Sequence, residues 1–200
     1  MLIPAPRDDL CLAFANTLSW RGSATPSEGL GGTEDLLRWL GSAAKLPGAS
    51  IAAAADRLRR RPNEAASLFE GAIGLREAIY RICIAVVKGW RAAAGDLELL
   101  NRELAAARAR ERVVAGGKRF AWEWDRRIPD LDRMLWPVAR SAAELLTSPD
   151  LVFTRACQGE DCGWLFLDTS RNRTRRWCDM SDCGNLAKVR RFRRRRGRAR

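Results

Sequence analysis

Residues 157–196 read CQGEDCGWLFLDTSRNRTRRWCDMSDCGNLAKVRRFRRRR and contain two pairs of cysteines followed by a run of basic residues. The cysteines follow the spacing C-x4-C-x15-C-x4-C, at Cys157, Cys162, Cys178 and Cys183. A tight turn can bring each pair to one ion, and four thiolates in a tetrahedron favour Zn²⁺. We expect one zinc ion at these residues, with an iron–sulfur cluster or a disulfide as the alternatives.

The expected zinc ion is structural, because four protein ligands leave no open coordination position for water. The chain has no histidine, which excludes Ser-His-Asp and Cys-His catalysis and a histidine general base. The carboxylates of Asp168, Asp179 and the Glu34-Asp35 pair form no defined acid–base pair, and we expect them to act as caps or ion-pair partners. We therefore expect no catalytic residues and no enzymatic activity.

Net positive charge gathers in the same part of the chain. The 200 residues carry a formal net charge of +12, and residues 151–200 alone account for +9 of it. Nearly all of the basic residues are arginines, which suit bidentate contacts to phosphate and guanine. A GC-rich genome also produces an arginine excess, but it would spread that excess along the whole chain.

The pattern predicts a helix over residues 184–196, in which so many like charges repel one another that an anionic partner is favoured. We expect this partner to be nucleic acid, either DNA or RNA. A solvated basic tail or a surface for an acidic protein is the alternative. The residues expected to contact nucleic acid are Arg171, Arg173, Arg175, Arg176, Asn185, Lys188, Arg190, Arg191, Arg193, Arg194 and Arg195.

The segment between the cysteine pairs is expected to form a short hairpin. An apolar strand over residues 164–167 would be followed by a turn over 168–172 and a returning segment over 174–177. Ser181 or Asp182 would then cap the C-terminal helix. Three apolar residues of that helix, spaced by three, are expected to pack against the finger: Leu186, Val189 and Phe192. Core packing is also expected for the aromatic residues Trp164, Phe166 and Trp177.

Residues 1–149 are expected to form a multi-helical domain, which Ser148-Pro149-Asp150 separates from a zinc-binding module over residues 150–200. The fold class is mainly α with a small β component, ending in a small four-cysteine zinc-binding module of the treble-clef type. Apolar spacings of three or four predict the body helices. They cover residues 33–45, an alanine-rich stretch that ends before Pro62, residues 63–93, residues 96–110, and a last stretch from Pro129-Asp130 to Thr147.

Local signals add detail to these body elements. The candidate N-caps are Thr33, Ser50, Asn63 and Asp96, and the residues expected to face inward on the helix over 96–110 are Leu97, Leu100 and Leu104. Pro137 implies a kink or a late start of the last helix. A glycine turn within residues 112–124 predicts a β-hairpin. Cys11 and Cys83 lie in apolar stretches and are expected to be buried, inert thiols.

The sequence favours a cytoplasmic protein with no membrane contact. It has no run of 18 apolar residues, which a membrane-spanning helix needs. The N-terminus has prolines and acidic residues where a signal peptide needs a basic start and an apolar core. In a reducing compartment, paired cysteines indicate metal ligands before disulfides.

The segment that opens this section resembles the CGNR zinc finger, which is named after the run that follows its last cysteine pair. The body resembles the ABATE domain, through LCLAFANTL with Asn16-Thr17, the later EGL and DLLRWL, and LREAIYRI. Together the two cover nearly the whole chain. The resemblance implies a bacterial, stress-related transcription regulator with a DNA-binding finger, whose motif residues here are Arg175, Arg176, Trp177, Met180, Gly184, Asn185 and Lys188 around the four cysteines.

The resulting hypothesis is a DNA-binding transcription regulator whose N-terminal domain senses a signal or mediates assembly. It leaves open a homodimer and a small-molecule effector, for which Asn16 and Thr17 are the candidate ligand-domain motif. The alternatives are an RNA-binding protein and a zinc-thiolate module for protein interaction or redox sensing. Two residues depart from the family pattern: Leu186 stands in place of the name-giving arginine, and Ala13 stands where an acidic residue is expected.

Overall fold

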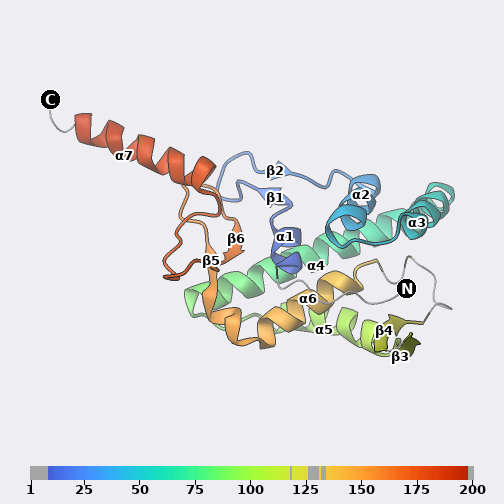
Figure 1. Ribbon diagram of the computed structural model, residues 1–200. Coiled ribbons are helices and arrows are strands. Elements are labelled where there is room, and N and C mark those ends of the chain that lie inside the picture. The colour runs from blue at the N-terminus through green and yellow to red at the C-terminus, as the bar shows by residue number, and fades with distance from the viewer. Residues whose placement is uncertain (1–8, 118, 126–130, 132–133, 198–200) are drawn as a thin grey trace.

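The computed structural model describes residues 9–117, 119–125, 131 and 134–197. Within them the chain forms seven α-helices and three two-stranded antiparallel sheets. The long helix α4 (Pro62–Lys88) lies at the centre, and α1 (Leu10–Ala15) and α5 (Ala94–Arg108) pack against it (Figure 1). The mainly helical fold with a small β component is therefore confirmed. None of the described helices is both long enough and apolar enough to cross a membrane.

Three further helices complete the body. Helices α2 (Thr33–Ala43) and α3 (Gly48–Arg60) pack against each other and against α4, whereas α6 (Trp136–Thr147) packs against α1 and α5. Pro137 occupies the first turn of α6, where its missing N–H leaves no bond unmade. Of the two predictions for this proline, the late start is therefore the observed one. The Pro129-Asp130 pair lies outside the described residues.

Helix α4 forms because its sequence repeats apolar residues at helical spacing and ends on a suitable cap. Ala72, Leu75, Ile79 and Ile82 lie on one buried stripe, as the periodicity predicts. The helix stops at Lys88 rather than at residue 93, because Gly89 adopts a left-handed conformation with φ of 67° that closes the last turn.

The predicted N-caps were wrong. Thr33 is the first residue of α2 and its hydroxyl donates to the carbonyl of Ala65 (3.2 Å), and Ser50 lies inside α3. Asn63 lies inside α4, which Arg61 precedes without a side-chain cap. Asp96 lies in the first turn of α5 and pairs with Arg81. Thr33 and Asp96 are thus held by tertiary partners and are not free to cap.

Helix α5 turns only part of its apolar pattern inward. Leu100 is buried and Leu104 packs partly against the core, as predicted, but Leu97 is exposed.

The predicted hairpin is confirmed as β3 (Glu111–Gly116) paired with β4 (Arg119–Trp124). Its buried end packs the Trp124 ring edge-on against Trp136, with ring centroids 5.7 Å apart.

The C-terminal part begins with a 3₁₀ turn, η2 (Pro149–Phe153), and continues into β5 (Thr154–Ala156). Strand β5 pairs antiparallel with β6 (Leu165–Leu167), so that the first cysteine pair lies in the loop between them. The predicted hairpin between residues 164–167 and 174–177 was therefore wrong, because the partner of the apolar strand precedes the cysteines. A π-helical turn, η3 (Met180–Gly184), leads into α7 (Asn185–Gly197).

One hydrophobic core serves both the helices and β6. It is formed largely by leucine, alanine and isoleucine side chains of the helices, and it includes Leu165 from the C-terminal part, which is 1% exposed. Cys11 and Cys83 lie in this core, and burial raises the pKa of both thiols, that of Cys11 to about 12, as expected for inert cysteines.

The short pair β1 (Leu18–Ser19) and β2 (Ser27–Glu28) follows α1 and reaches towards the C-terminal part (Figure 1).

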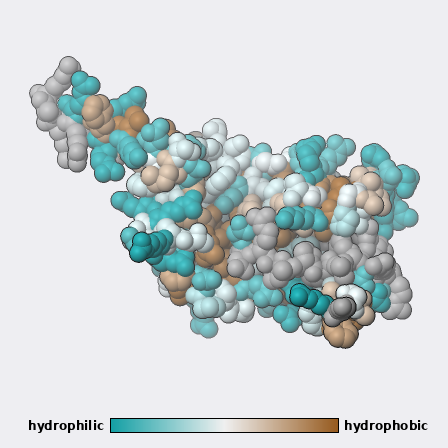
Figure 2. All heavy atoms as spheres, in the orientation of Figure 1, coloured by the Kyte–Doolittle hydropathy of each residue, from teal (hydrophilic) through white to brown (hydrophobic). Residues whose placement is uncertain are grey.

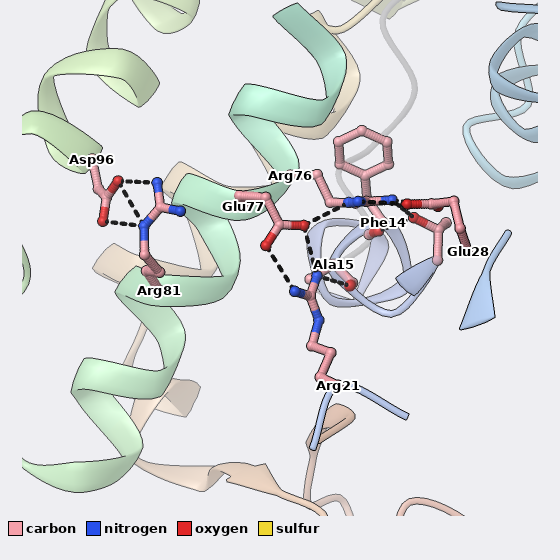
Figure 3. A network of polar contacts seen from close by, with 9 residues as sticks. Phe14, Ala15, Arg21, Glu28, Arg76, Glu77, Arg81 and Asp96 are labelled. Atoms are coloured by element: carbon pink, nitrogen blue, oxygen red, sulfur yellow. Dashed lines mark hydrogen bonds and ion pairs between the residues drawn. The ribbon is translucent and has the colours of Figure 1, made fainter. Parts of the chain in front are cut away.

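A buried network of charges joins α4 to the segment that follows α1 (Figure 3). Arg76 is 2% exposed and donates to both oxygens of Glu28 (2.6 and 2.8 Å) and to Glu77 (2.9 Å). Glu77 also accepts two bonds from Arg21, whose guanidinium lies 3.8 Å from the centre of the Tyr80 ring. Burial acts to raise the pKa of Glu28 and Glu77, but the arginine hydrogen bonds outweigh it and hold both pKa values below their usual range.

Replacement of Arg76 by leucine should lower the free energy of unfolding by about 2 kcal/mol, because it leaves the carboxylates of Glu28 and Glu77 beside an apolar side chain. The loss is expected to be smaller than for a fully buried pair, because Glu28 reaches solvent. Urea denaturation followed by circular dichroism measures it. The control is Arg38→Ala, which breaks the exposed pair with Asp35 and should leave the free energy of unfolding nearly unchanged. Equal effects of the two substitutions would contradict the importance of the buried network.

Candidate metal centre and nucleic-acid interface

The four C-terminal cysteines come from separate elements and meet at one point. Cys157 follows β5, Cys162 precedes β6, Cys178 lies in the loop after β6, and Cys183 lies in η3. Their sulfur atoms all lie within 4.8 Å of one another. The Sγ atoms of Cys162 and Cys178 are 3.7 Å apart, and those of Cys178 and Cys183 are 3.8 Å apart. The sequence prediction that these residues gather is thus matched by the geometry.

This arrangement fits a tetrahedral zinc ion. With Zn–S bonds of about 2.3 Å, the sulfur atoms of a regular tetrahedron lie about 3.8 Å apart, as the two separations do here. Four cysteines fill the coordination sphere, so the ion would have a structural role. When bound, it supplies four strong bonds that tie two loops and η3 to one point.

The backbone around the cluster favours a thiolate at Cys157. Its sulfur accepts hydrogen bonds from the N–H groups of Gly159 and Cys178, both at 3.3 Å. Burial acts to raise the pKa of Cys157, but these N–H groups outweigh it and bring that pKa below its usual value. Space beside the cluster is tight at Gly159, because a Cβ atom there would lie 3.0 Å from the Cys183 sulfur.

The second cysteine pair is positioned by a capped turn. Asp179 accepts hydrogen bonds from the backbone N–H groups of Ser181 (2.6 Å) and Asp182 (3.3 Å), and it therefore caps η3. The predicted caps, Ser181 and Asp182, were wrong by two or three residues, because the helical turn begins at Met180. Since η3 continues directly into α7, the cap and Cys183 together fix the start of the basic helix.

Asp168 organises the loop between β6 and Cys178. It is fully buried, and its carboxylate accepts bonds from the N–H (3.0 Å) and hydroxyl (2.5 Å) of Ser170 and from the N–H of Arg175 (2.9 Å). The hydrogen bonds from Ser170 and from the N–H of Arg175 hold the pKa of Asp168 below its usual range, although burial acts to raise it. Its oxygens are occupied by the loop, which matches the expected structural role.

Two arginines predicted to contact nucleic acid are used inside the finger. Arg175 donates to the carbonyls of Trp177 (2.8 Å) and Cys178, and its guanidinium lies 4.7 Å from the centre of the Phe166 ring. Arg173 donates to the carbonyl of Asp168 and lies over the ring of Phe153. Both side chains thus stabilise the loop that positions Cys178 in the four-cysteine cluster. Sequence cannot separate them from the outer arginines, because all carry the same charge.

The other predicted contact residues lie further out. Arg176 donates to Gln158 (2.6 Å) and Arg190 pairs with Glu160 (2.5 Å), both on the surface. Among the described residues, no ion pair engages the exposed side chains of Arg171, Lys188, Arg191 and Arg193. Asn185 is exposed at the start of α7. The side chains of Arg194 and Arg195 lie outside the described part of the helix.

The apolar residues of the finger divide into two groups. Phe166 is buried among the cysteines, with Trp164 and Trp177 packed partly against the same cluster, as predicted. Leu186, Val189 and Phe192 are 41%, 40% and 59% exposed, so the prediction that they pack against the finger was wrong. The reason is that α7 leads away from the rest of the molecule (Figure 1), which leaves Val189 and Phe192 without a neighbouring element, whereas Leu186 borders a hollow that Trp20 also lines.

Asn16 joins the helical body to the finger. Its Nδ2 donates to the carbonyl of Leu165 (2.7 Å), and its Oδ1 accepts from the N–H of Leu165 (2.9 Å). The side-chain amide therefore bonds to β6 as a neighbouring strand would. Thr17 instead donates to the carbonyl of Phe14 and holds the end of α1 (2.8 Å). This joining role of Asn16 is one that sequence reasoning missed; a polar amide within an apolar stretch was the available signal.

Three more bonds cross the same junction. The indole N–H of Trp164 donates to the hydroxyl of Ser19 (3.1 Å), and the backbone N–H of Gly22 donates to the carbonyl of Asp161 (3.0 Å). The N–H of Arg21 donates to the carbonyl of Cys162 (3.4 Å). Arg21 thus links a zinc-binding loop, through its backbone N–H, to the charge network, through its guanidinium.

Replacement of Cys178 by serine should release the zinc ion, because a neutral hydroxyl is a weak substitute for one of four thiolates. Metal analysis of the purified chain should find one zinc per wild-type chain and a deficit in this variant. The control is Cys83→Ala, at a buried cysteine of the helical core, which should retain one zinc per chain. A full equivalent of zinc in the Cys178→Ser protein would contradict the assignment of the ligands.

Replacement of Asn16 by alanine should loosen β6, because the backbone N–H and carbonyl of Leu165 lose their partners. Amide hydrogen exchange at Leu165 should accelerate by about tenfold or more, and the free energy of unfolding should fall by about 1–2 kcal/mol. Mass-spectrometric exchange on a peptide that contains β6 measures the first effect. The exposed Asn172→Ala serves as control and should change neither quantity. Unchanged exchange at Leu165 would show that the junction does not depend on Asn16.

Comparison with known families bears on both halves of this arrangement. Residues 154–196 match the CGNR zinc finger, and together with the four-cysteine cluster this match establishes one structural zinc ion as the cofactor. Residues 8–149 match ABATE, described as "Putative stress-induced transcription regulator". Neither family is one of enzymes, and no curated protein matches the chain. Since the ABATE match alone covers more than half of the residues, the chain belongs to the ABATE family and carries a CGNR zinc finger after the ABATE region.

Proposed function

We propose that the protein is a transcription regulator that binds double-stranded DNA through its zinc finger and α7. The observation that carries the proposal is the unneutralised positive charge of α7. Lys188, Arg191 and Arg193 are exposed and have no ion-pair partner within the described residues. Such a helix is stabilised when phosphate groups neutralise the basic side chains that repel one another. The release of counterions from DNA adds to the binding free energy.

The shape of the molecule supports a helix that enters a groove. Helix α7 extends beyond the body and presents most of its surface to solvent (Figure 1). The major groove of B-form DNA is about 12 Å wide and accommodates an α-helix. Asn185 stands at the first turn of α7, where an amide can bond to an adenine edge, while the basic residues on either side can reach phosphates.

The zinc site would serve this function by fixing the direction of α7. Cys183 lies in η3, one turn before the helix, and Cys178 precedes the Asp179 cap. With both sulfur atoms held, the helix starts from a rigid point. Arg173 and Arg175 would act on DNA binding only indirectly, because they hold the loop before Cys178.

We propose that the domains divide at residues 149 and 150, with the helical domain receiving a signal or mediating assembly. The junction bonds of Asn16 and Arg21 connect it to the finger. Between α1 and β6 lies a hollow of about 590 Å³, whose lining includes Ala13, Asn16, Trp164 and Arg175. A small effector in this hollow would contact both the helical domain and Arg175, whose side chain bonds to the Cys178 carbonyl. Effector binding would therefore be coupled to the position of the finger.

DNA binding is tested by fluorescence anisotropy of a labelled duplex titrated with zinc-loaded protein over a range of salt concentrations. The logarithm of the affinity should fall linearly with the logarithm of the salt concentration, by about 0.9 per phosphate neutralised. Lys188→Ala and Arg191→Ala should each weaken binding and reduce the slope by about 1, because each removes one phosphate contact.

The control for general charge is Arg102→Ala, an exposed arginine of α5 in the body, which should leave both affinity and slope unchanged. Zinc content is measured for each variant, so that a loss of binding is not a loss of the finger. Equal loss from Arg102→Ala, or no binding to duplex DNA at low salt, would refute the proposal. Tighter binding to structured RNA in a competition assay would instead favour the RNA-binding alternative.

A further inference from the structure

The outer face of α7 carries a row of exposed apolar side chains. Leu186, Val189 and Phe192, here called the apolar ridge, recur at a spacing of three, which places them along one side of the helix. Scattered exposed apolar residues are ordinary, but a continuous row on an otherwise charged helix marks a contact surface. On the projecting helix, Figure 2 shows some hydrophobic (brown and tan) atoms among mostly hydrophilic ones.

Basic side chains border the apolar ridge. Val189 and Phe192 line a shallow hollow together with Lys188, Arg193 and Arg196. The Arg196 guanidinium lies 5.5 Å from the centre of the Phe192 ring. A partner of this surface must therefore bring negative charge to the edges and apolar surface to the middle. A second copy of α7 would instead bring like charges together, which opposes pairing of two such helices.

The major groove of duplex DNA has this combination of properties. Phosphates run along both edges, and the 5-methyl group of each thymine projects from the floor as the apolar part of the base edges. The ridge runs from Leu186 to Phe192 on the 13-residue helix, about 9 Å, so it can follow the groove over about three base pairs. Double-stranded RNA does not offer this combination, because its major groove is too narrow for a helix and its uracil lacks the methyl group.

We propose that the apolar ridge contacts thymine methyl groups in the major groove and gives the protein a preference for thymine-containing sites. The proposal rests on the DNA binding proposed above and assigns a specificity role to residues that carry no charge. In it, the arginines and Lys188 supply affinity that does not depend on sequence, while Leu186, Val189 and Phe192 supply discrimination between bases.

The test compares two duplexes that differ only in the methyl group. One is an alternating A·T duplex, and the other has deoxyuridine at every thymidine position. Both have the same charge, length and base-pairing groups, and both are titrated at one salt concentration. The wild-type protein should bind the thymine duplex more tightly by about fourfold for each methyl group that it buries.

Variants of the ridge separate its contribution from that of DNA shape. Val189→Ala and Phe192→Ala should bind both duplexes about equally, while the salt dependence stays as in the wild type. Alanine is a good helix former and both positions are exposed, so α7 should remain folded, which zinc content and circular dichroism check. The controls are Val152→Ala and Phe120→Ala, residues of the same types that are even more exposed elsewhere on the surface, which should keep the full thymine preference.

Each other outcome has a defined meaning. Tight, salt-dependent binding with no difference between thymine and deoxyuridine would overturn the role of the ridge and leave the proposed DNA binding standing. A thymine preference that persists in both ridge variants would also overturn it. Absence of binding to either duplex at low salt would refute the DNA-binding function itself. A wild-type dimer in sedimentation that becomes monomeric in the ridge variants would show that a second copy covers this face.

Discussion

The position of β6 between two cores is the constraint on which the rest of the structure depends. Successive residues of a strand point to opposite faces, and here Leu165 and Leu167 pack on the helical core while Phe166 packs among the cysteines. The pairing with β5 and the amide of Asn16 hold the strand in this register. A slip of one residue would turn Phe166 to the helices and the leucines to the zinc site. The finger is therefore not a freely tethered module, and the direction of α7 is set relative to the body.

Sequence reasoning succeeded where the information is local. The cysteine spacing identifies the cluster, the apolar period identifies α4, and the glycine turn identifies the hairpin of β3 and β4. It failed for the partner of β6, because β5 lies before the cysteines and its three residues carry no period that distinguishes them. The caps failed for a related reason: Thr33 and Asp96 have tertiary partners that local sequence does not reveal.

Arginine shows why the candidate site could be predicted only in outline. Arg76 is buried in a charge network, Arg175 bonds to carbonyls beside a cysteine, and Arg191 is exposed on α7. These three environments give the same residue three roles: core stability, loop geometry and, as we propose, phosphate contact. Charge counting along the sequence locates the basic region correctly. It cannot separate these roles, because they depend on which carbonyls and carboxylates the fold brings within reach.

The error over Leu186, Val189 and Phe192 is informative in itself. A spacing of three predicts burial because apolar side chains on one helical face usually meet another element of the same chain. Here α7 starts at a fixed point beside Cys183 and then leaves the body, so no element of the described chain covers Val189 and Phe192. A helix that exposes both apolar and basic groups is suited to a partner with matching apolar and acidic groups. Because the zinc site fixes the direction of the helix, this exposed face has a defined position relative to the body, which the face of a mobile tail would not have.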